Sequence, residues 1–570
     1  MEVDAPFVRD ILAKMCWRTL PAHCSVRTIW ASAVILWRWI TSVAKKNKLP
    51  NPKRIELKSP QMKAFLKRVK ERSLAEEDYE IIQGMAETLQ CLNQALEEKT
   101  TSIKRLLRYL FGAPTETARN VLPKKNPAPQ IPTAGEKPKR KGHGRNGASS
   151  YTGGSHVAIS HPSLQVGDDC PVCYKGKVYR LSLPSVVVRI VGNAPLHSTV
   201  YELERLRCNL CGELFTAPAP EEARQGKYDE SAAAMIAVLK YGCGMPFHRL
   251  EKLQGNLAMP VPASTQWEIV EAAKKVIDPV HAALLQEAAQ GEVVHNDDTT
   301  VKILAYLDEQ DSENTRKGIF TTGMLSIKDN RRIAIFMTGR HHAGENLEEL
   351  LKARASGLAP PIQMCDALSR NAPKEFKTIL ANCLAHARRQ FVDIAGAFSA
   401  ECEHVIELLG KVYHNDAVAR EQGLDKQQRL QSHQKQSGPI MEQLKTWCED
   451  RFAQKLVEPN SSLGKATKYL LKHWDKLTRF LHVAGAPLDN NICERALKLA
   501  ILHRKNALFF KTQNGAHVGD VFLSLIHTCQ LAGENPFDYL KQLQRHASKL
   551  AQDPKRWLPW SYRETLSSLE

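Results

Sequence analysis

The stretch EVVHNDDTT, residues 292 to 300, decides the fold class, because an apolar extended run ends here in two adjacent acids. Three more short extended runs follow it: VKILAYL at 301–307, GIFTTGMLSI at 318–327 and RRIAIFMTG at 331–339. Their polar breaks predict a meander of antiparallel strands. A helical run at 346–354 comes next, and PIQMCDA at 361–367 predicts a buried strand. The order of strands, helix, strand and further helices favours an α/β fold.

Acids stand at both ends of this series of strands. Asp297 ends the first strand and Asp366 ends the last, so the two lie close together if these strands are neighbours in the sheet. Such carboxylates are suited to Mg²⁺, which prefers oxygen ligands and leaves positions for water and phosphate. For either residue alone, a turn residue is the simpler interpretation. The pair indicates a metal site only if a third ligand joins it.

A candidate third ligand lies in LDNNICERALKLAILHRKN, residues 488 to 506. A helix over 489–503 places Glu494 on its polar side, opposite an apolar stripe. That stripe contains Ile492, Ala496 and Leu499. Glu494 has two interpretations: a solvated pair with Lys498 four residues on, or the acid that completes a metal site with Asp297 and Asp366. Two metal ions held in this way can clamp the oxygens of a phosphoryl displacement. The expected phosphate-binding cations on this segment are Arg495, Lys498, Arg504 and Lys505.

The charge balance indicates a polyanionic partner. The 570 residues include 79 Lys and Arg against 61 Asp and Glu, for a net charge of +18 and a pI near 9.2. The most apolar stretch, residues 28–37, is far shorter than the roughly 20 residues that cross a bilayer and lacks the features of a signal peptide. We therefore expect no membrane partner, and a cytoplasmic, nucleoid-associated protein.

Four of the 14 cysteines form two C-x-x-C knuckles, CPVC and CNLC. Residues rich in Val, Ile, Thr and Tyr lie between them and predict short strands. The knuckles offer four thiolates for a closed tetrahedral Zn²⁺ site, which predicts a zinc ribbon. A redox C-x-x-C pair is the alternative, but the βαβ setting of such motifs is missing. The predicted zinc ligands are Cys170, Cys173, Cys208 and Cys211.

The flanking segments predict helices and a linker. A heptad pattern at 82–110 is typical of a coiled coil or of a helical hairpin. The Pro-rich basic segment at 123–147 predicts a linker whose cations follow a phosphate backbone. Those cations include Lys139, Arg140, Lys141 and Arg145. Residues 229–290 are expected to be helical. Two helices joined by GNLAMPVPAS form either a helix-turn-helix or a plain helical hairpin. Thr265 and Glu268 predict a capping box at the start of the second, longer helix.

From about 55 to 545 the chain resembles the large transposase of the insertion sequence 66 family of bacterial mobile elements. The resemblance rests on several motifs in the family's order: HGRNG, the double knuckle, the APAP hinge, KYGCGMPFHRLE, HNDDTT, CLAHARRQF, LDNNICERALKLAILHRKNALFF and SLIHTCQLAGENPFDYL. It implies a DDE-type enzyme with catalytic residues Asp297, Asp366 and Glu494 in a ribonuclease H-like core that binds Mg²⁺ or Mn²⁺. It also implies a helical insertion between the last two acids, terminal inverted repeats and target DNA as partners, homo-oligomers, and small accessory proteins.

The sequence departs from the family pattern at three positions. Asp298 stands where a Glu is common, Ala367 where a Gly is common, and Lys498 where an Arg is common. The leading acids are kept, so the departures do not exclude activity. Residues 1–50 lie outside the resemblance, as they would if the start codon were misplaced. A non-catalytic DNA-binding remnant, or a metal-dependent nuclease that cuts without joining, remains an alternative to a transposase.

One further pair has metal-binding spacing. Cys383 and His386 lie three residues apart on an expected helix. Two ligands are too few for a metal site, so we favour a structural role for the pair, with His386 and Arg388 facing DNA.

The expected architecture is multidomain α/β. Its segments are an unassigned extension (1–54), a helical or coiled-coil region (55–112), a basic linker (113–155), a zinc ribbon (156–220), a helical DNA-binding region (221–290), a ribonuclease H-like core (291–510) with a helical insertion at about 385–485, and a C-terminal helical region (511–570).

Overall fold

The computed structural model describes residues 157–569 apart from 182–188, 191, 208, 210, 212, 225 and 307–317, together with scattered positions between 64 and 83. The chain divides into two compact units, Met1–Thr115 and Glu116–Glu570. In the first unit, Arg68 forms an ion pair of 2.6 Å with Asp78, and its hydrogen bonds lower the pKa of that carboxyl to about 2. The coiled-coil segment and the basic linker, with Lys139, Arg140, Lys141 and Arg145, fall almost entirely outside the described residues.

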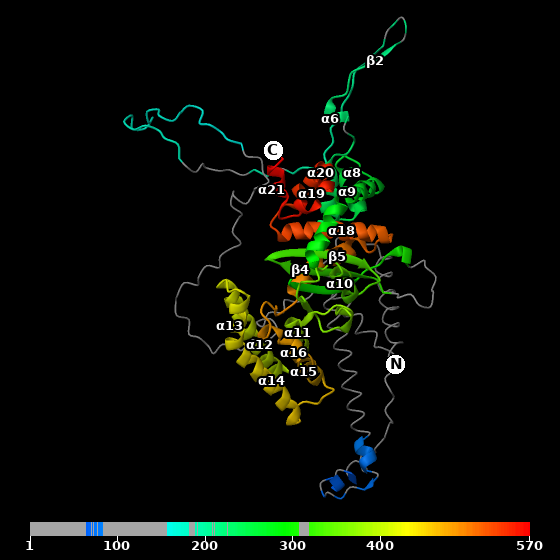
Figure 1. The fold of residues 1–570 in the computed structure, drawn as a ribbon, viewed down its shortest axis with the longest axis vertical. Helices are drawn as coiled ribbons and strands as arrows, with labels where there is room; N and C mark the ends of the chain where they lie inside the picture. The colour runs from blue at the N-terminus through cyan, green and yellow to red at the C-terminus, as the bar shows by residue number, and fades with distance from the viewer. Residues whose placement is uncertain are drawn as a thin grey trace, which may run out of the picture. The chain divides into compact units, whose positions relative to one another are not determined.

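A five-stranded mixed sheet forms the centre of the second unit (Figure 1). Its strand order is β5-β4-β3-β6-β7, with β3, β4 and β5 antiparallel and β6 and β7 parallel to β3. The strands are β3 (Val293–Thr300), β4 (Phe320–Lys328), β5 (Arg331–Gly339), β6 (Ile362–Cys365) and β7 (Ile379–Asn382). The α/β class expected from the sequence is confirmed.

Two strand assignments differ from the sequence-based ones. VKILAYL is not a strand of the sheet: Ile303 makes one isolated bridge to Phe510, and the 3₁₀ turn η3 (Leu304–Tyr306) follows. Ile303 packs into a small separate cluster with Ile319, which explains its apolar character without a strand. Strand β7 was not expected, because its four residues are too short for a recognisable period.

Helix α18 (Gln513–Leu531) packs along the edge strand β5 and satisfies its outward-facing backbone groups. The N–H groups of Ala334, Phe336 and Thr338 donate to side chains of α18 at 3.0, 2.9 and 2.7 Å. The acceptors lie four residues apart on the helix, at Thr528, Ser524 and Asp520. Four residues of helix rise about 6 Å and two residues of strand about 6.8 Å. The acceptors along α18 and the N–H donors along β5 are therefore almost equally spaced. The helix thereby closes an edge that could otherwise pair with another chain.

Replacing Asp520 tests this edge closure. Burial raises the pKa of Asp520 to about 7, although two hydrogen bonds from Thr338 oppose the shift. A raised pKa favours folding at low pH, so this group's contribution to stability is lost as the pH rises from about 4 to about 7. Asp520→Ala leaves the Thr338 N–H without its acceptor and should cost about 1–3 kcal/mol. Asp520→Asn keeps an acceptor and should flatten the pH dependence, as measured by urea unfolding between pH 5 and pH 8.

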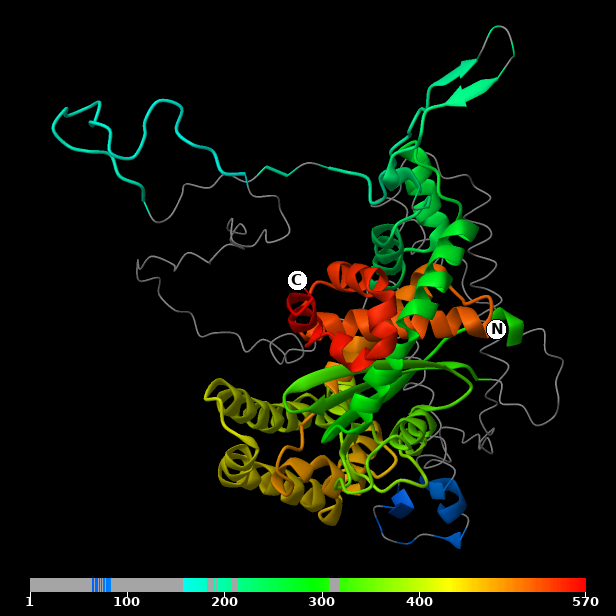
Figure 2. The ribbon, with the colours of Figure 1, turned by 45° about the horizontal axis from the view of Figure 1, so that its top comes forward.

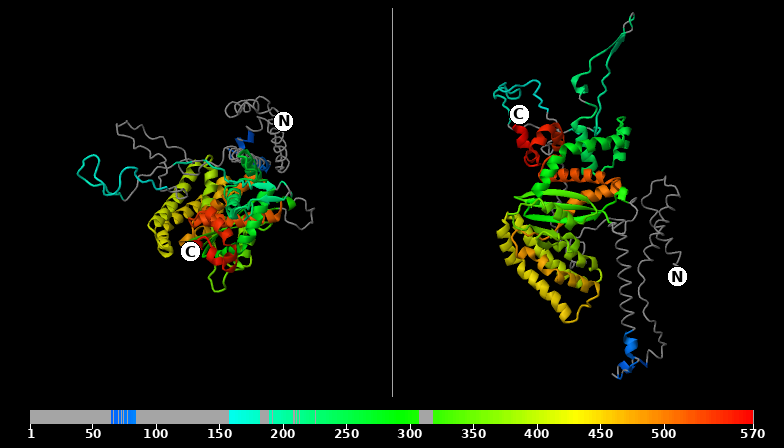
Figure 3. Two further views of the ribbon diagram at one scale, coloured as in Figure 1. Left: turned by 90° about the horizontal axis from the view of Figure 1, so that it is seen from above. Right: turned by 45° about the vertical axis from the view of Figure 1, so that its right-hand side comes forward.

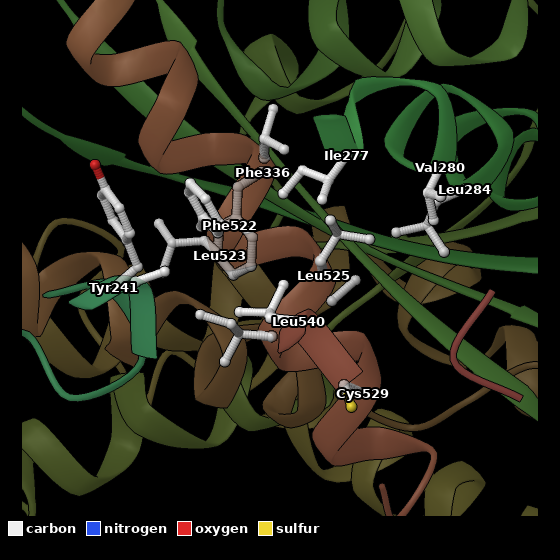
Figure 4. Close-up of a cluster of buried hydrophobic side chains, with 14 of the residues drawn as sticks. Tyr241, Ile277, Val280, Leu284, Phe336, Phe522, Leu523, Leu525, Cys529 and Leu540 are labelled. Carbon is white, nitrogen blue, oxygen red and sulfur yellow. The ribbon is translucent and has the colours of Figure 1, made fainter. Parts of the chain in front are cut away.

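Helices around α9 and α18 enclose the larger hydrophobic core. Tyr241, Ile277, Phe336 and Phe522 belong to it, and Figure 4 shows that strands and helices from distant parts of the chain contribute. Besides α18, the helices that contribute buried residues to this core are α7 (Glu230–Ala237), the π-helical turn η2 (Val238–Gly242), α8 (Phe247–Asn256), α9 (Ala263–Ala289), α10 (Ala343–Leu351), α17 (Asn491–Ala507), α19 (Pro536–Arg545), α20 (Ala547–Gln552) and α21 (Tyr562–Ser567). The short helix α6 (Glu221–Arg224) precedes α7. Helix α9 begins at Ala263 after Pro262 with no side-chain cap, so the capping box expected at Thr265 is wrong.

A second hydrophobic core joins the sheet to the helices between β7 and α17. These helices and the α18–α20 layer lie on opposite sides of the sheet (Figures 2 and 3). The segment contains α11 (Leu384–Ile394), α12 (Ser399–Glu421), α13 (Lys426–Gln436), α14 (Gly438–Ala453), α15 (Ser462–Lys472), α16 (Trp474–Leu477) and the 3₁₀ turn η5 (Arg479–Leu481). Val293 and Met364 of the sheet pack in this core, which anchors the helical segment to β3 and β6.

Both cysteine knuckles lie between antiparallel segments, as the sequence predicts. Asp169 bridges Lys177 around the first knuckle, and β1 (Arg205–Arg207) pairs with β2 (Leu214–Thr216) around the second. Backbone N–H groups of Lys175 and Gly176, followed by the Cys170 thiol, hold the pKa of Cys173 below its ordinary value. Cys208 lies outside the described residues, so the four-sulfur zinc site with Cys170, Cys173 and Cys211 stays a prediction.

In the part of the chain that the structure describes, none of the helices has both the length and the apolar character of a bilayer-spanning segment.

Candidate functional site

The sheet brings Asp297 and Asp366 side by side. Strands β3 and β6 run parallel, and the last paired residues are His295 and Met364. Asp297 and Asp366 each lie two residues beyond this pair, so the same register carries both onto one face. Asp297 lies inside β3, opposite Gly323, and not at the strand end that the sequence suggested. The side-chain amide of Asn371 donates a hydrogen bond to Asp366 Oδ1, which fixes the orientation of this carboxylate.

The neighbouring acid, Asp298, points to the opposite face. One of its carboxylate oxygens is 3.1 Å from His342 Nδ1 and the other is 3.1 Å from Arg370 Nη2. The Asp298 side chain is 1% exposed, so these two contacts, and not solvent, compensate its negative charge. Strand alternation therefore assigns Asp297 to the site and gives Asp298 a structural role.

Helix α17 places Glu494 at the edge of a buried stripe. The buried residues of this helix are Cys493, Ala496, Leu497, Ala500 and His503. The stripe is shifted from the expected one at Ile492, Ala496 and Leu499, and Glu494 is consequently not on a solvated face: its side chain is 26% exposed and its Oε1 is buried. Its ion pairs run to His386 and Arg389, both at 3.7 Å.

The start of α17 is held on the sheet by Asn490, which is fully buried. Its side-chain amide donates to the Asn296 carbonyl at 3.2 Å, so its Oδ1 accepts from His295 Nδ1 at 3.0 Å. Burial lowers the pKa of His295 to about 4, which keeps this ring neutral at pH 7. The backbone N–H of Asn490 donates to the Cys383 sulfur at 3.2 Å. These bonds fix the first turn of the helix that carries Glu494.

Glycine at position 323 allows α17 to approach β4 closely. The Cys493 thiol donates to the Gly323 carbonyl at 3.2 Å. A Cβ atom at position 323 would lie 2.8 Å from Leu497 Cδ2 and 2.9 Å from Cγ of the same residue. Any larger residue here must displace the Leu497 side chain or the helix that carries it.

Gly323→Val is therefore expected to move Glu494 and to slow any reaction at the site. A misplacement of about 1 Å can cost about 10²-fold in rate, while overpacking costs about 1–3 kcal/mol of stability. Single-turnover DNA cleavage and urea unfolding separate the two effects. Gly339→Ala is the matched control in the same sheet, because its Cβ meets only Gln513 at 3.9 Å. Equal cleavage rates for both variants would contradict the inferred role.

The three acids interact electrostatically at the site. Burial raises the pKa of Asp297 to about 7, and the charges of Asp366, Asp298 and Glu494 raise it further against one hydrogen bond from the Asp298 N–H. These carboxylates repel one another at a half-buried position, and Glu494 Oε1 is buried with no hydrogen-bond partner among the described residues; both features fit a divalent cation. The donor set is all oxygen, which suits Mg²⁺ or Mn²⁺. Asp297, Asp366 and Glu494 are the residues that would hold it.

Cation binding at these acids should depend on pH. Because the folded-state pKa of Asp297 is raised to about 7, the stability linked to this group falls as the pH rises from about 4 to about 7. Binding requires the ionised carboxylate, so Mg²⁺ affinity should rise over the upper part of the same window. The increase in melting temperature caused by Mg²⁺ should be larger at pH 8 than at pH 6. An equal increase at both values would contradict this assignment.

The expected DNA-binding cations on α17 fall into two groups. Arg495, Lys498 and Lys505 are exposed. Arg504 is bound to β3, since its Nη1 donates to Thr299 Oγ1 at 3.0 Å and to the Thr300 carbonyl at 2.6 Å. That contact positions the helix. On α11, Arg388 is half-buried and already has a partner.

A second group of ligating side chains surrounds Glu494. The Cys383 sulfur, a His386 ring nitrogen and a Glu494 oxygen all lie within 4.8 Å of one another. The sequence gave Cys383 and His386 a structural role and did not connect them to Glu494. Sequence analysis also missed His295, Asn490 and Gly323, although a polar residue inside a strand, as at His295, was a usable signal.

Comparison with known proteins identifies related chains. A family model described as "Transposase IS66 family" matches residues 225–518. Three relatives come from Sinorhizobium fredii and are named uncharacterized proteins y4jD, y4qI and y4hP. The first is 34% identical over 32% of this chain and 36% of its own length. The second is 27% identical over 59% of this chain and 62% of its own length. The third is 25% identical over 63% of this chain and 67% of its own length. The chain thus spans less than two thirds of the first two relatives.

Proposed function

The chain belongs to the IS66 family of transposases, and on this basis we propose that it is a DDE-type enzyme that cuts and joins DNA at the terminal inverted repeats of an insertion sequence. The observation that supports the proposal is that the β3–β6 register places Asp297 and Asp366 on one face, and that the charges of Asp366 and Glu494 both raise the pKa of Asp297. The sheet order β5-β4-β3-β6-β7 supports a ribonuclease H-like core. The helical segment between β7 and α17 then corresponds to the expected insertion.

The reaction needs a divalent cation at these acids. A bound Mg²⁺ or Mn²⁺ would neutralise charge on the scissile phosphate and promote the attack of water or of a 3′ hydroxyl. Asp297 and Asp366 hold their carboxylates on the rigid sheet, and Glu494 closes the group from α17. Asn371, Asn490 and Gly323 position these acids. Burial of Asp297 limits competing water at the site.

The first step that we propose is hydrolysis of a phosphodiester bond at the element end, which leaves a free 3′ hydroxyl. In the second step this hydroxyl attacks a target phosphodiester, so that one P–O bond forms as another breaks. No covalent bond to the protein is required. The exposed cations Arg495, Lys498 and Lys505 bind the backbone of the substrate strand, and the net charge of +18 favours association with DNA.

A strand-transfer assay on labelled element ends tests the proposal. The purified full-length chain is incubated with its own inverted-repeat DNA and a plasmid target, with and without Mg²⁺. We expect metal-dependent cleavage followed by joined products. Cleavage without joining would identify a nuclease, and DNA retention without cleavage in the wild type would identify a non-catalytic DNA-binding protein.

A further inference from the structure

Glu494 interacts with two different groups of ligands. On one side its charge raises the pKa of Asp297. On the other side it forms, with Cys383 and His386, a cluster whose ligand atoms are all within 4.8 Å of one another. The first group offers oxygen alone, whereas the second offers sulfur, nitrogen and oxygen. The two sets therefore suit different cations.

The second cluster is rigidly built. Cys383 lies between β7 and α11, where its sulfur accepts the Asn490 N–H at 3.2 Å. His386 is in the first turn of α11, and its Nε2 is 3.7 Å from Glu494 Oε1. Glu494 Oε1 is buried and has no hydrogen-bond partner among the described residues. A buried polar atom without a hydrogen bond is costly, and a cation would satisfy this oxygen.

The separations suit a single small ion. Zinc–sulfur bonds of about 2.3 Å and zinc–nitrogen bonds of about 2.0 Å in a tetrahedron place ligand atoms about 3.5 Å apart. The separation of 3.7 Å between His386 and Glu494 is already close to this value. Small side-chain rotations would bring the Cys383 sulfur into range. On binding, the thiol loses its proton to solvent, so a thiolate and a carboxylate together balance the charge of a divalent ion.

We propose that Cys383, His386 and Glu494 form a second metal site for a thiophilic divalent cation such as Zn²⁺, and that its occupation withdraws Glu494 from Asp297 and Asp366. Zn²⁺ thereby acts as an inhibitor of the Mg²⁺-dependent reaction. The inhibitory part rests on the proposed function, but the binding part does not.

Titration of the metal-free full-length chain with Co²⁺ tests the binding part, because thiolate-bound Co²⁺ absorbs in the near ultraviolet. The wild type should bind one more equivalent than Cys383→Ser or His386→Gln. Comparison of variants removes the contribution of the four knuckle cysteines, which all of them share. Cys448→Ser is the matched control, since this cysteine is equally buried in α14 and should leave the stoichiometry unchanged.

Equal stoichiometry in the wild type and in His386→Gln would overturn the proposal. If Cys383→Ser does not fold, His386→Gln alone tests the proposal, because the half-buried His386 can be replaced with less disturbance. A second measurement adds one equivalent of Zn²⁺ beyond the knuckle site to the Mg²⁺-dependent cleavage assay, where we expect at least a tenfold loss of rate. Absence of cleavage before Zn²⁺ is added would refute the proposed function and leave the Co²⁺ result standing.

Discussion

Asp297→Asn is expected to lower the rate of DNA strand cleavage by about 10³-fold or more while DNA retention stays nearly unchanged. The substitution removes a charged oxygen ligand without changing the shape of the side chain, and a loss of about 4 kcal/mol of transition-state stabilisation corresponds to about 10³ in rate. Asp297 forms no ion pair with another described residue, so stability should fall little or rise, because its burial raises the pKa and disfavours the ionised form. Single-turnover cleavage and gel retention on the same DNA measure both effects.

The adjacent acid provides a matched control. Asp298 differs from Asp297 by one position, yet its carboxylate pairs with His342 and Arg370 on the opposite face of the sheet. Asp298→Asn should reduce stability and retain most of the cleavage rate per folded molecule. If Asp298→Asn abolished cleavage in a folded protein while Asp297→Asn did not, the assignment of the two acids would be reversed.

The largest expected loss of stability comes from Asp416→Ala in the helical segment. The Asp416 side chain is 4% exposed and contacts three partners: Arg420 at 2.6 Å, Arg429 at 2.5 Å and His433 at 3.0 Å. Removal of one member of such a buried group leaves uncompensated charge, which costs about 3–5 kcal/mol. Urea unfolding monitored by circular dichroism measures the loss. Asp450→Ala, at an exposed position of α14, should change stability by less than about 0.5 kcal/mol.

The same carboxylate predicts sensitivity to acid. Burial alone would raise the pKa of Asp416, but His433, Arg429 and Arg420 outweigh it and hold the pKa below its ordinary value. A lowered pKa gives stability that is present above pH 3.8 and lost as the pH falls further. The difference in stability between wild type and Asp416→Ala should therefore shrink in acid. A constant difference down to pH 3 would show that packing, and not charge, accounts for the loss.

The helix that carries Glu494 shows where pattern reading fails. The sequence pattern placed Ile492 and Leu499 in the buried stripe because they are hydrophobic. In the structure the buried residues of the helix include Cys493, Leu497 and Ala500 instead. Small residues bring α17 close to Gly323, so the stripe follows the narrowest approach between helix and sheet and not the most apolar side chains. This rotation moves Glu494 from the solvated side to the margin of the core.

Sequence-based assignment was more successful for the strands of the sheet than for this helix. Residues 331–339 were assigned to a strand from a short apolar run between polar breaks, and they form β5 over the same range. The same reasoning fails at 301–307, where Ile303 packs against apolar neighbours outside the sheet. It also misses β7, whose four residues become a strand only because β6 supplies the hydrogen bonds.

The sequence by itself determined the α/β class and the three candidate acids, because strand alternation and residue chemistry are properties of short stretches of chain. Only the tertiary structure decided that Asp298 faces away from the site and that Glu494 interacts both with Asp297 and with the Cys383–His386 pair. Those facts depend on the register of β3 against β6 and on how α17 packs over Gly323. Contacts between residues so far apart in the chain come from packing, which no local pattern encodes.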